Sequence, residues 1–134
     1  MTLYLDTSAL LRRYVRTAGS ILVEETMAAD GEWCTSALTR TELLLALSAC
    51  SVTSHQRERL WDRARLDWES FWVVPTDGRC LAEAADTGSR YGLRTVDAIH
   101  LASASRLPSP KYVTFDRRQI PGASALGFEV VSPA

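Results

Sequence analysis

Short apolar segments alternate with longer helix-forming segments along the chain, and this alternation constrains the fold more than any other feature of the sequence. The apolar segments are brief and rich in Leu, Val, Tyr and Phe, as expected for strands that are covered on both faces. We expect strands over residues 3–5, 32–35, 71–74, 112–115 and 128–131. We expect a first helix that Thr7 or Ser8 caps and that runs to about Arg16. Further helices are expected over residues 21–29, 37–49, 55–69, 78–90 and 96–106. A helix between successive strands makes those strands parallel, so the sequence predicts the α/β class and a three-layer α/β/α sandwich with a parallel sheet.

The size and composition of the chain fit one domain. It has 134 residues, of which 46% are hydrophobic, so a single domain over residues 1–134 can bury a sizeable core. No apolar segment approaches the roughly 20 residues of a membrane span, and the first residues lack the features of a signal peptide. The three cysteines, Cys34, Cys50 and Cys80, show no paired spacing and are expected to be reduced. We therefore expect a cytoplasmic protein without a membrane association.

Helix boundaries are predicted from residues that favour caps or turns. Ser36 is expected to cap the helix that follows it, and Thr95 is expected to cap the helix over 96–106. Gly92 is expected in the left-handed conformation at the end of the preceding helix. Between the last two strands we expect a loop, because this segment contains Pro121, Gly122 and Gly127.

Four acidic residues lie where a parallel sheet builds its site. Asp6 and Asp116 follow expected strands, while Glu42 and Asp97 lie near the starts of expected helices. Carboxylates brought together at this edge repel one another unless a cation lies between them, and helix N-termini ease that repulsion. Oxygen ligands favour Mg²⁺ or Mn²⁺ over zinc, and such ions support hydrolysis of phosphodiester bonds. We predict catalytic roles for all four acids, with Asp6, Asp97 and Asp116 as metal ligands.

Two hydroxyl groups are predicted to support this site. Thr114 shares a strand face with Asp116, because side chains two residues apart in a strand point the same way. Ser8 lies close after Asp6 and is placed to hold a water molecule. His100 follows Asp97 by one helical turn, and we expect it to pack or to hydrogen-bond behind the site. His55 is expected on the surface.

The charge pattern permits a ligand rich in phosphate. The net charge is −1, but outside the four site acids the chain carries 15 basic against 12 acidic residues, and Lys111 is the only lysine. Arginine binds phosphate with two parallel hydrogen bonds. Five arginines close to the site acids are therefore candidates for contacts with a nucleic-acid backbone: Arg12, Arg13, Arg40, Arg94 and Arg117. Aromatic residues that can stack on bases, but more often pack, are Trp61, Trp68 and Trp72.

Four segments together resemble the signature of the PIN domain, and within that family the VapC toxins. These segments are Leu5–Leu10 (LDTSAL), Thr39–Leu43 (TRTEL), Asp97–Ala102 (DAIHLA) and Thr114–Asp116 (TFD). The resemblance covers essentially the whole chain and implies a five-stranded parallel sheet of order 3-2-1-4-5. It also implies Mg²⁺-dependent cleavage of RNA, a homodimer and inhibition by a small VapB-type antitoxin. The family's acids fall on Asp6, Glu42, Asp97 and Asp116, and its hydroxyls on Ser8 and Thr114.

Other interpretations of the same residues remain open. Asp6 can serve as a helix cap, and Asp97 can support the cap at Thr95. Glu42 can be a solvated helix acid, and Asp116 can be the first residue of a turn. A non-catalytic module that binds RNA or a partner protein is one alternative function, and a metal-dependent DNA or flap-type nuclease is another. A phosphatase of the haloacid type requires a second Asp where Ser8 stands, and a phospho-receiver requires an adjacent acidic pair and a late Lys, so both are disfavoured.

Overall fold

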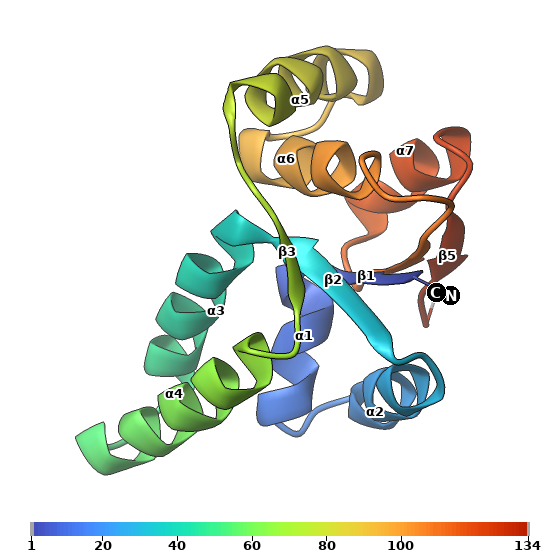
Figure 1. Cartoon of the computed structure of the whole chain (residues 1–134). Coiled ribbons are helices and arrows are strands. Elements are labelled where there is room, and N and C mark those ends of the chain that lie inside the picture. Colours follow the sequence, from blue (N-terminus) through green and yellow to red (C-terminus); the bar gives the residue numbers. More distant parts are fainter. Residues whose placement is uncertain (1, 134) are drawn as a thin grey trace.

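A computed structural model describes residues 2–133 of the chain as a three-layer α/β/α sandwich (Figure 1). The sheet has five parallel strands in the order β3-β2-β1-β4-β5, which confirms the predicted fold class and strand order. Its strands are β1 (Thr2–Leu5), β2 (Glu32–Ser36), β3 (Trp72–Val74), β4 (Lys111–Val113) and β5 (Glu129–Val131). No helix within residues 2–133 is both long enough and apolar enough to cross a membrane.

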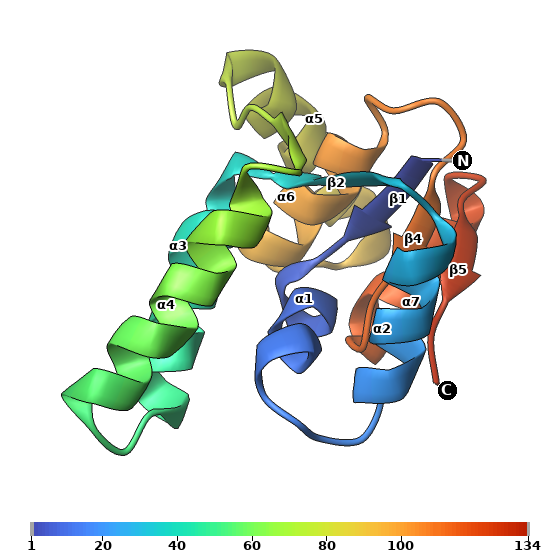
Figure 2. The same ribbon diagram turned by 60° about the horizontal axis from the view of Figure 1, so that its bottom comes forward.

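Helices cover both faces of the sheet. Four helices lie on one face: α1 (Thr7–Tyr14), α2 (Ser20–Ala29), α3 (Ala37–Cys50) and α4 (Ser54–Trp68). The helices on the other side are α5 (Gly78–Tyr91), α6 (Thr95–Ala104) and α7 (Ile120–Ala125), with the 3₁₀ turn η1 (Arg117–Gln119) before α7. Figure 2 shows that the antiparallel pair α3 and α4 extends beyond the edge of the sheet.

The alternation of side chains along β1 divides the core in two. Leu3 and Leu5 pack among α1 to α4, whereas Tyr4 packs against α6 and α7 on the opposite face. The parallel register places Tyr4 beside Cys34 of β2 and beside Tyr112 of β4. Because all strands are parallel, their carboxyl ends meet at one edge, and β1 to β4 each lead from there into a helix or turn.

Two predicted caps are wrong. Asp6, not Thr7 or Ser8, caps α1, because its Oδ1 accepts a hydrogen bond of 2.9 Å from the Ala9 amide. The capping position of α6 is occupied by Arg94, which forms no side-chain cap, and Thr95 is already helical. The caps predicted at Ser36 and at Gly92 are confirmed. The termini of several helices and strands also differ by one or two residues, with α1 ending at Tyr14 instead of Arg16.

The expected loop between the last strands contains a helix. Pro121 lies in the first turn of α7, where its missing N–H leaves no hydrogen bond unmade. Gly122 allows close packing, because a Cβ atom at this position would lie 2.8 Å from the Leu101 side chain. Proline and glycine therefore start and pack this helix, although in sequence they resemble breakers.

Candidate active site

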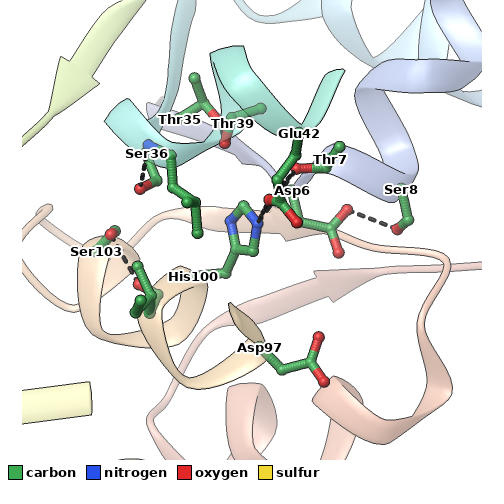
Figure 3. A network of polar contacts seen from close by, with 12 residues as sticks. Asp6, Thr7, Ser8, Thr35, Ser36, Thr39, Glu42, Asp97, His100 and Ser103 are labelled. Carbon is green, nitrogen blue, oxygen red and sulfur yellow. Dashed lines mark hydrogen bonds and ion pairs between the residues drawn. The ribbon is translucent and has the colours of Figure 1, made fainter. Parts of the chain in front are cut away.

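The four predicted acids line one pocket at the carboxyl ends of β1 and β4. Figure 3 shows Asp6, Glu42 and Asp97 from close by. The pocket has a volume of about 510 Å³ and lies between these strand ends, α3 and α6. Its lining consists of Asp6, Thr7, Ser8, Glu42, Arg94, Thr95, Val96, Asp97, His100, Asp116 and Gln119. Residues far apart in the sequence meet here because strand ends and helix starts converge at this edge.

Asp6 is buried and held by three hydrogen bonds. Its Oδ1 accepts from Ser8 Oγ at 2.7 Å and from the Ala9 amide, and its Oδ2 accepts from Thr114 Oγ1 at 2.7 Å. Both hydroxyls in turn accept from backbone amides after β4, Ser8 from Phe115 and Thr114 from Asp116, each at 3.0 Å. Burial raises the pKa of Asp6, although His100 and the donated hydrogen bonds oppose this shift.

Asp97 presents one bound and one free carboxylate oxygen. Gln119 Nε2 donates to Oδ1 at 2.9 Å, while Oδ2 is buried without a hydrogen-bond partner among the described residues. Arg94 Nε lies 3.7 Å from Oδ2, which is too far for a hydrogen bond. A buried carboxylate oxygen without a partner is costly, so this atom is chemically suited to bind a cation.

Glu42 is anchored from two sides through a single oxygen. Thr7 Oγ1 donates to its Oε1 at 2.6 Å, and His100 Nε2 lies 2.9 Å from the same atom. Tyr4 Oη lies 2.8 Å from His100 Nδ1, so the imidazole bridges a strand and a helix. Burial alone raises the pKa of Glu42, but the hydrogen bonds from His100 and Thr7 outweigh it and leave the pKa lowered. This confirms the expectation that His100 hydrogen-bonds behind the site.

Asp116 is turned toward a neighbouring arginine. Arg118 Nε donates to its Oδ1 at 3.1 Å and Arg118 Nη2 to its Oδ2 at 3.2 Å. Burial raises the pKa of Asp116, but the interactions with Arg118 outweigh it and lower the pKa. Since the Arg118 side chain is 58% exposed, breaking this ion pair costs little.

The donors suit a hard cation, but their present arrangement does not surround one. Within residues 2–133, no three His, Cys, Asp or Glu side chains are grouped closely enough to hold a metal ion. Asp6 uses both carboxylate oxygens on protein donors, Glu42 uses one, and both oxygens of Asp116 accept from Arg118. Arg118 would therefore compete with an ion shared by Asp6, Asp97 and Asp116 for the Asp116 carboxylate. The metal roles of these residues stay predictions.

Of the five arginines predicted to contact a nucleic acid, Arg94 lines the pocket. Arg13 instead pairs with Asp67 at 2.9 Å, and Arg12 donates to the carbonyl oxygens of Ser8 and Ala18 while stacking on Phe115. Arg40 and Arg117 are exposed outside the pocket lining. Contact with RNA stays a prediction for all five, and the pocket favours Arg94.

The remaining singled-out residues lie away from the pocket. Trp61 and Trp68 are partly buried beside α3 and β3, where Trp61 Nε1 donates to the Leu44 carbonyl at 2.9 Å. Trp72 and His55 are exposed, the latter as predicted. The three cysteines are free.

Several residues of the site carry no signal that identifies them in the sequence. In the sequence, Thr7 resembles a helix cap, and Gln119 lies in a charged segment that is typical of a surface turn. Tyr4 and Tyr112 read as ordinary core residues of two strands. Their roles depend on which strands are neighbours and in which register, and local patterns do not contain that information.

Comparisons with known proteins point to one family. The family profile described as "PIN domain" matches residues 3–121. The chain is 32% identical over 133 residues to "Ribonuclease VapC45" of Mycobacterium tuberculosis, covering 95% of this chain and 92% of that protein. Its fold is similar to FitAcB from Neisseria gonorrhoeae, with a TM-score of 0.78, 20% identity and 98% of each chain covered. It is also similar to a toxin–antitoxin complex from Klebsiella pneumoniae, with a TM-score of 0.73, 20% identity and coverage of 99% and 98%.

Proposed function

Since the chain belongs to the PIN domain family, we propose that it is a Mg²⁺-dependent endoribonuclease and the toxin of a toxin–antitoxin pair. The observation that carries this proposal is the free, buried Oδ2 of Asp97 in a pocket that also contains Asp6 and Asp116. An anionic pocket of this kind needs a cation before it can accept a phosphodiester. The name of the relative from M. tuberculosis supports RNA as the substrate.

Each charged side chain of the pocket has a separate role in the proposed reaction. Asp6, Asp97 and Asp116 would hold Mg²⁺, and Mn²⁺ can replace it. When bound, the ion supplies positive charge that polarises the phosphodiester and supports in-line attack by water. Glu42 stays charged, and its Oε2 is left to accept a hydrogen bond from the attacking water, since both Thr7 and His100 bind Oε1. Arg94 at the pocket wall attracts the RNA backbone.

We further propose a VapB-type antitoxin as the partner of this protein. Structural relatives solved as toxin–antitoxin complexes, at 20% identity, motivate this assignment. An arginine directed at the acids from such a partner would match the geometry of a carboxylate and compete with the cation for the same charge. Asp97 Oδ2, which has no hydrogen-bond partner within residues 2–133, is one acceptor that such a side chain would satisfy.

The decisive experiment measures cleavage of an RNA oligonucleotide by the purified protein. We expect activity with Mg²⁺ or Mn²⁺, none in excess EDTA, and products that end in 5′-phosphate and 3′-hydroxyl groups. Asp97→Asn should reduce cleavage by about 100-fold or more, on the scale of losing an electrostatic contact to a transition state. Asp62→Asn is the matched control, because the Asp62 side chain is 77% exposed on α4 and lies outside the pocket.

Three outcomes would contradict the proposal. Full activity in excess EDTA would rule out a requirement for the metal. A product that ends in a 2′,3′-cyclic phosphate would rule out attack by water. Cleavage of DNA but not of RNA under the same conditions makes the protein a deoxyribonuclease instead.

A further inference from the structure

Two buried tyrosines lie directly beneath the pocket, side by side on the sheet. The parallel register pairs Tyr4 of β1 with Tyr112 of β4, and both side chains are fully buried. Their rings stack with centroids 5.2 Å apart and planes inclined by 5°. Each phenol is hydrogen-bonded to one polar side chain, and that side chain is hydrogen-bonded to one site acid. The sheet register thus fixes the spacing of two hydrogen-bonded chains.

The first chain runs from Tyr112 through Gln119 to Asp97. Tyr112 Oη donates to Gln119 Oε1 at 2.6 Å, and Gln119 Nε2 donates to Asp97 Oδ1 at 2.9 Å. The orientation of the amide follows from chemistry, because a carboxylate only accepts hydrogen bonds and must therefore face the NH₂ group. The phenol then has to donate to the amide oxygen, so all three groups have one consistent arrangement.

The second chain runs from Tyr4 through His100 to Glu42. The phenol lies 2.8 Å from His100 Nδ1, and His100 Nε2 lies 2.9 Å from Glu42 Oε1. Since the carboxylate only accepts, Nε2 carries a proton, and in the neutral imidazole Tyr4 therefore donates to Nδ1. The two chains are separate, because each ends on a different acid.

We propose that Gln119, locked in orientation by Tyr112, is the positioning residue that turns the free oxygen of Asp97 toward the metal. This inference rests on the proposed function. A carboxylate can turn about χ2, and a hydrogen bond to one of its oxygens restrains the plane of the group. Gln119 holds one oxygen of Asp97, so the other oxygen, which has no hydrogen-bond partner among the described residues, keeps a fixed position.

The burial of Gln119 argues that it is more than packing. Its side chain is almost fully buried, and burying an amide costs free energy that an apolar side chain at this position would not incur. Both polar atoms of its amide are used, one on Tyr112 and one on Asp97. Side chains that hold a metal ligand from behind typically contribute about 10- to 100-fold to metal affinity or activity.

The test compares Gln119→Leu, Tyr112→Phe and the double variant with the wild-type protein. Mn²⁺ affinity is measured by titration calorimetry without RNA, and kcat and KM are measured on an RNA oligonucleotide. We expect Gln119→Leu to weaken Mn²⁺ binding and lower kcat by about 10- to 100-fold while KM for RNA is unchanged. Tyr112→Phe should act in the same direction by about tenfold or less, because only the lock on the amide is lost. In the double variant, Tyr112→Phe should add nothing to Gln119→Leu.

Tyr4→Phe provides the comparison within the same stack. It removes the matching hydroxyl of the other chain, so its loss of kcat should multiply with that of Gln119→Leu. Thermal unfolding checks each variant. If Gln119→Leu fails to fold, Tyr112→Phe decides alone, because it removes one oxygen and keeps the ring stack.

The outcomes separate this inference from the proposed function. Wild-type protein that neither cleaves RNA nor binds Mn²⁺ overturns both. An active wild-type protein whose Mn²⁺ affinity is unchanged by Tyr112→Phe and Gln119→Leu overturns the positioning role alone. Multiplying losses for these two substitutions also overturn it, because they would show independent effects.

Discussion

Single side chains in this site combine a structural and a chemical role. Asp6 caps α1 and also lines the pocket, so the helix start and the site depend on the same carboxylate. Ser8 and Thr114 each connect one oxygen of Asp6 to a backbone amide after β4. The two hydroxyls therefore join the ends of β1 and β4 through the acid between them.

Removal of the Thr114 hydroxyl should weaken both the fold and the site. Thr114→Val keeps the shape but leaves the Asp116 amide and one Asp6 oxygen without their partner, at a cost of about 1–3 kcal/mol. Thr114→Ser is the matched variant, since it keeps the hydroxyl and loses only a methyl group. We expect urea unfolding to show a greater loss of stability for Thr114→Val than for Thr114→Ser. RNA cleavage should show a greater loss of activity for the same variant. Equal activity of the two variants would contradict the role of the hydroxyl.

At the scale of elements, a charged cluster fastens α4 to α1. Asp67 accepts from Arg13 Nε at 2.9 Å and from Tyr14 Oη at 2.7 Å. Burial raises the pKa of Asp67, but the hydrogen bonds from Arg13 and Tyr14 outweigh it and leave the pKa lowered. Arg13 is thereby committed to holding two helices together, which explains why it is a poor candidate for binding RNA.

Loss of this cluster should depend on pH in a defined direction. Because the folded pKa of Asp67 lies below its unfolded value of about 3.9, its contribution is complete above that value and is lost as pH falls through the folded pKa. Asp67→Asn should cost about 1–2 kcal/mol at pH 7, and the difference from wild type should shrink below about pH 4. Urea unfolding between pH 3 and pH 7 measures this difference in the free energy of unfolding, with Asp62→Asn on the same helix as the control. A difference that does not change with pH would contradict the assignment.

At the scale of the whole molecule, the α3–α4 pair, which extends beyond the edge of the sheet (Figure 2), carries exposed apolar side chains. Leu45 is 65% exposed, Leu66 69%, and Val52 between the two helices 90%. Exposed apolar side chains on a projecting pair of helices favour association with another chain.

We expect the protein to be a homodimer, as the family resemblance implies. Light scattering at micromolar concentration should give about twice the mass of the 14.8 kDa chain. A monomer at that concentration would contradict the dimer without affecting the proposal for the active site.

Expression of the protein without a partner should arrest bacterial growth, because an unrestrained ribonuclease degrades cellular RNA. Asp6→Asn should relieve the arrest, since it removes a charge from the proposed metal site with little change in shape. Growth curves after induction, with immunoblots to confirm equal protein levels, measure the effect. Arrest that persists with Asp6→Asn would separate toxicity from the pocket.

The sequence by itself determined the alternation of strands and helices and the identity of the four acids. These features are local: an apolar run followed by Asp6, or Asp116 after a strand, is visible in a few neighbouring residues. The strand order 3-2-1-4-5 came only from the family resemblance, and the sheet confirms it. Helix α7 was missed, because Pro121 and Gly122 break helices in general and favour them only at the positions they occupy here.

The tertiary structure alone decided how the acids are held. Gln119 reaches Asp97 and Tyr112 only because η1 folds over β4, and Tyr4 stacks on Tyr112 only because β1 and β4 pair in this register. Hydrogen bonds between residues distant in the chain depend on the mutual placement of whole elements. No local pattern specifies that placement, so the acids were predictable from the sequence and the side chains that orient them were not.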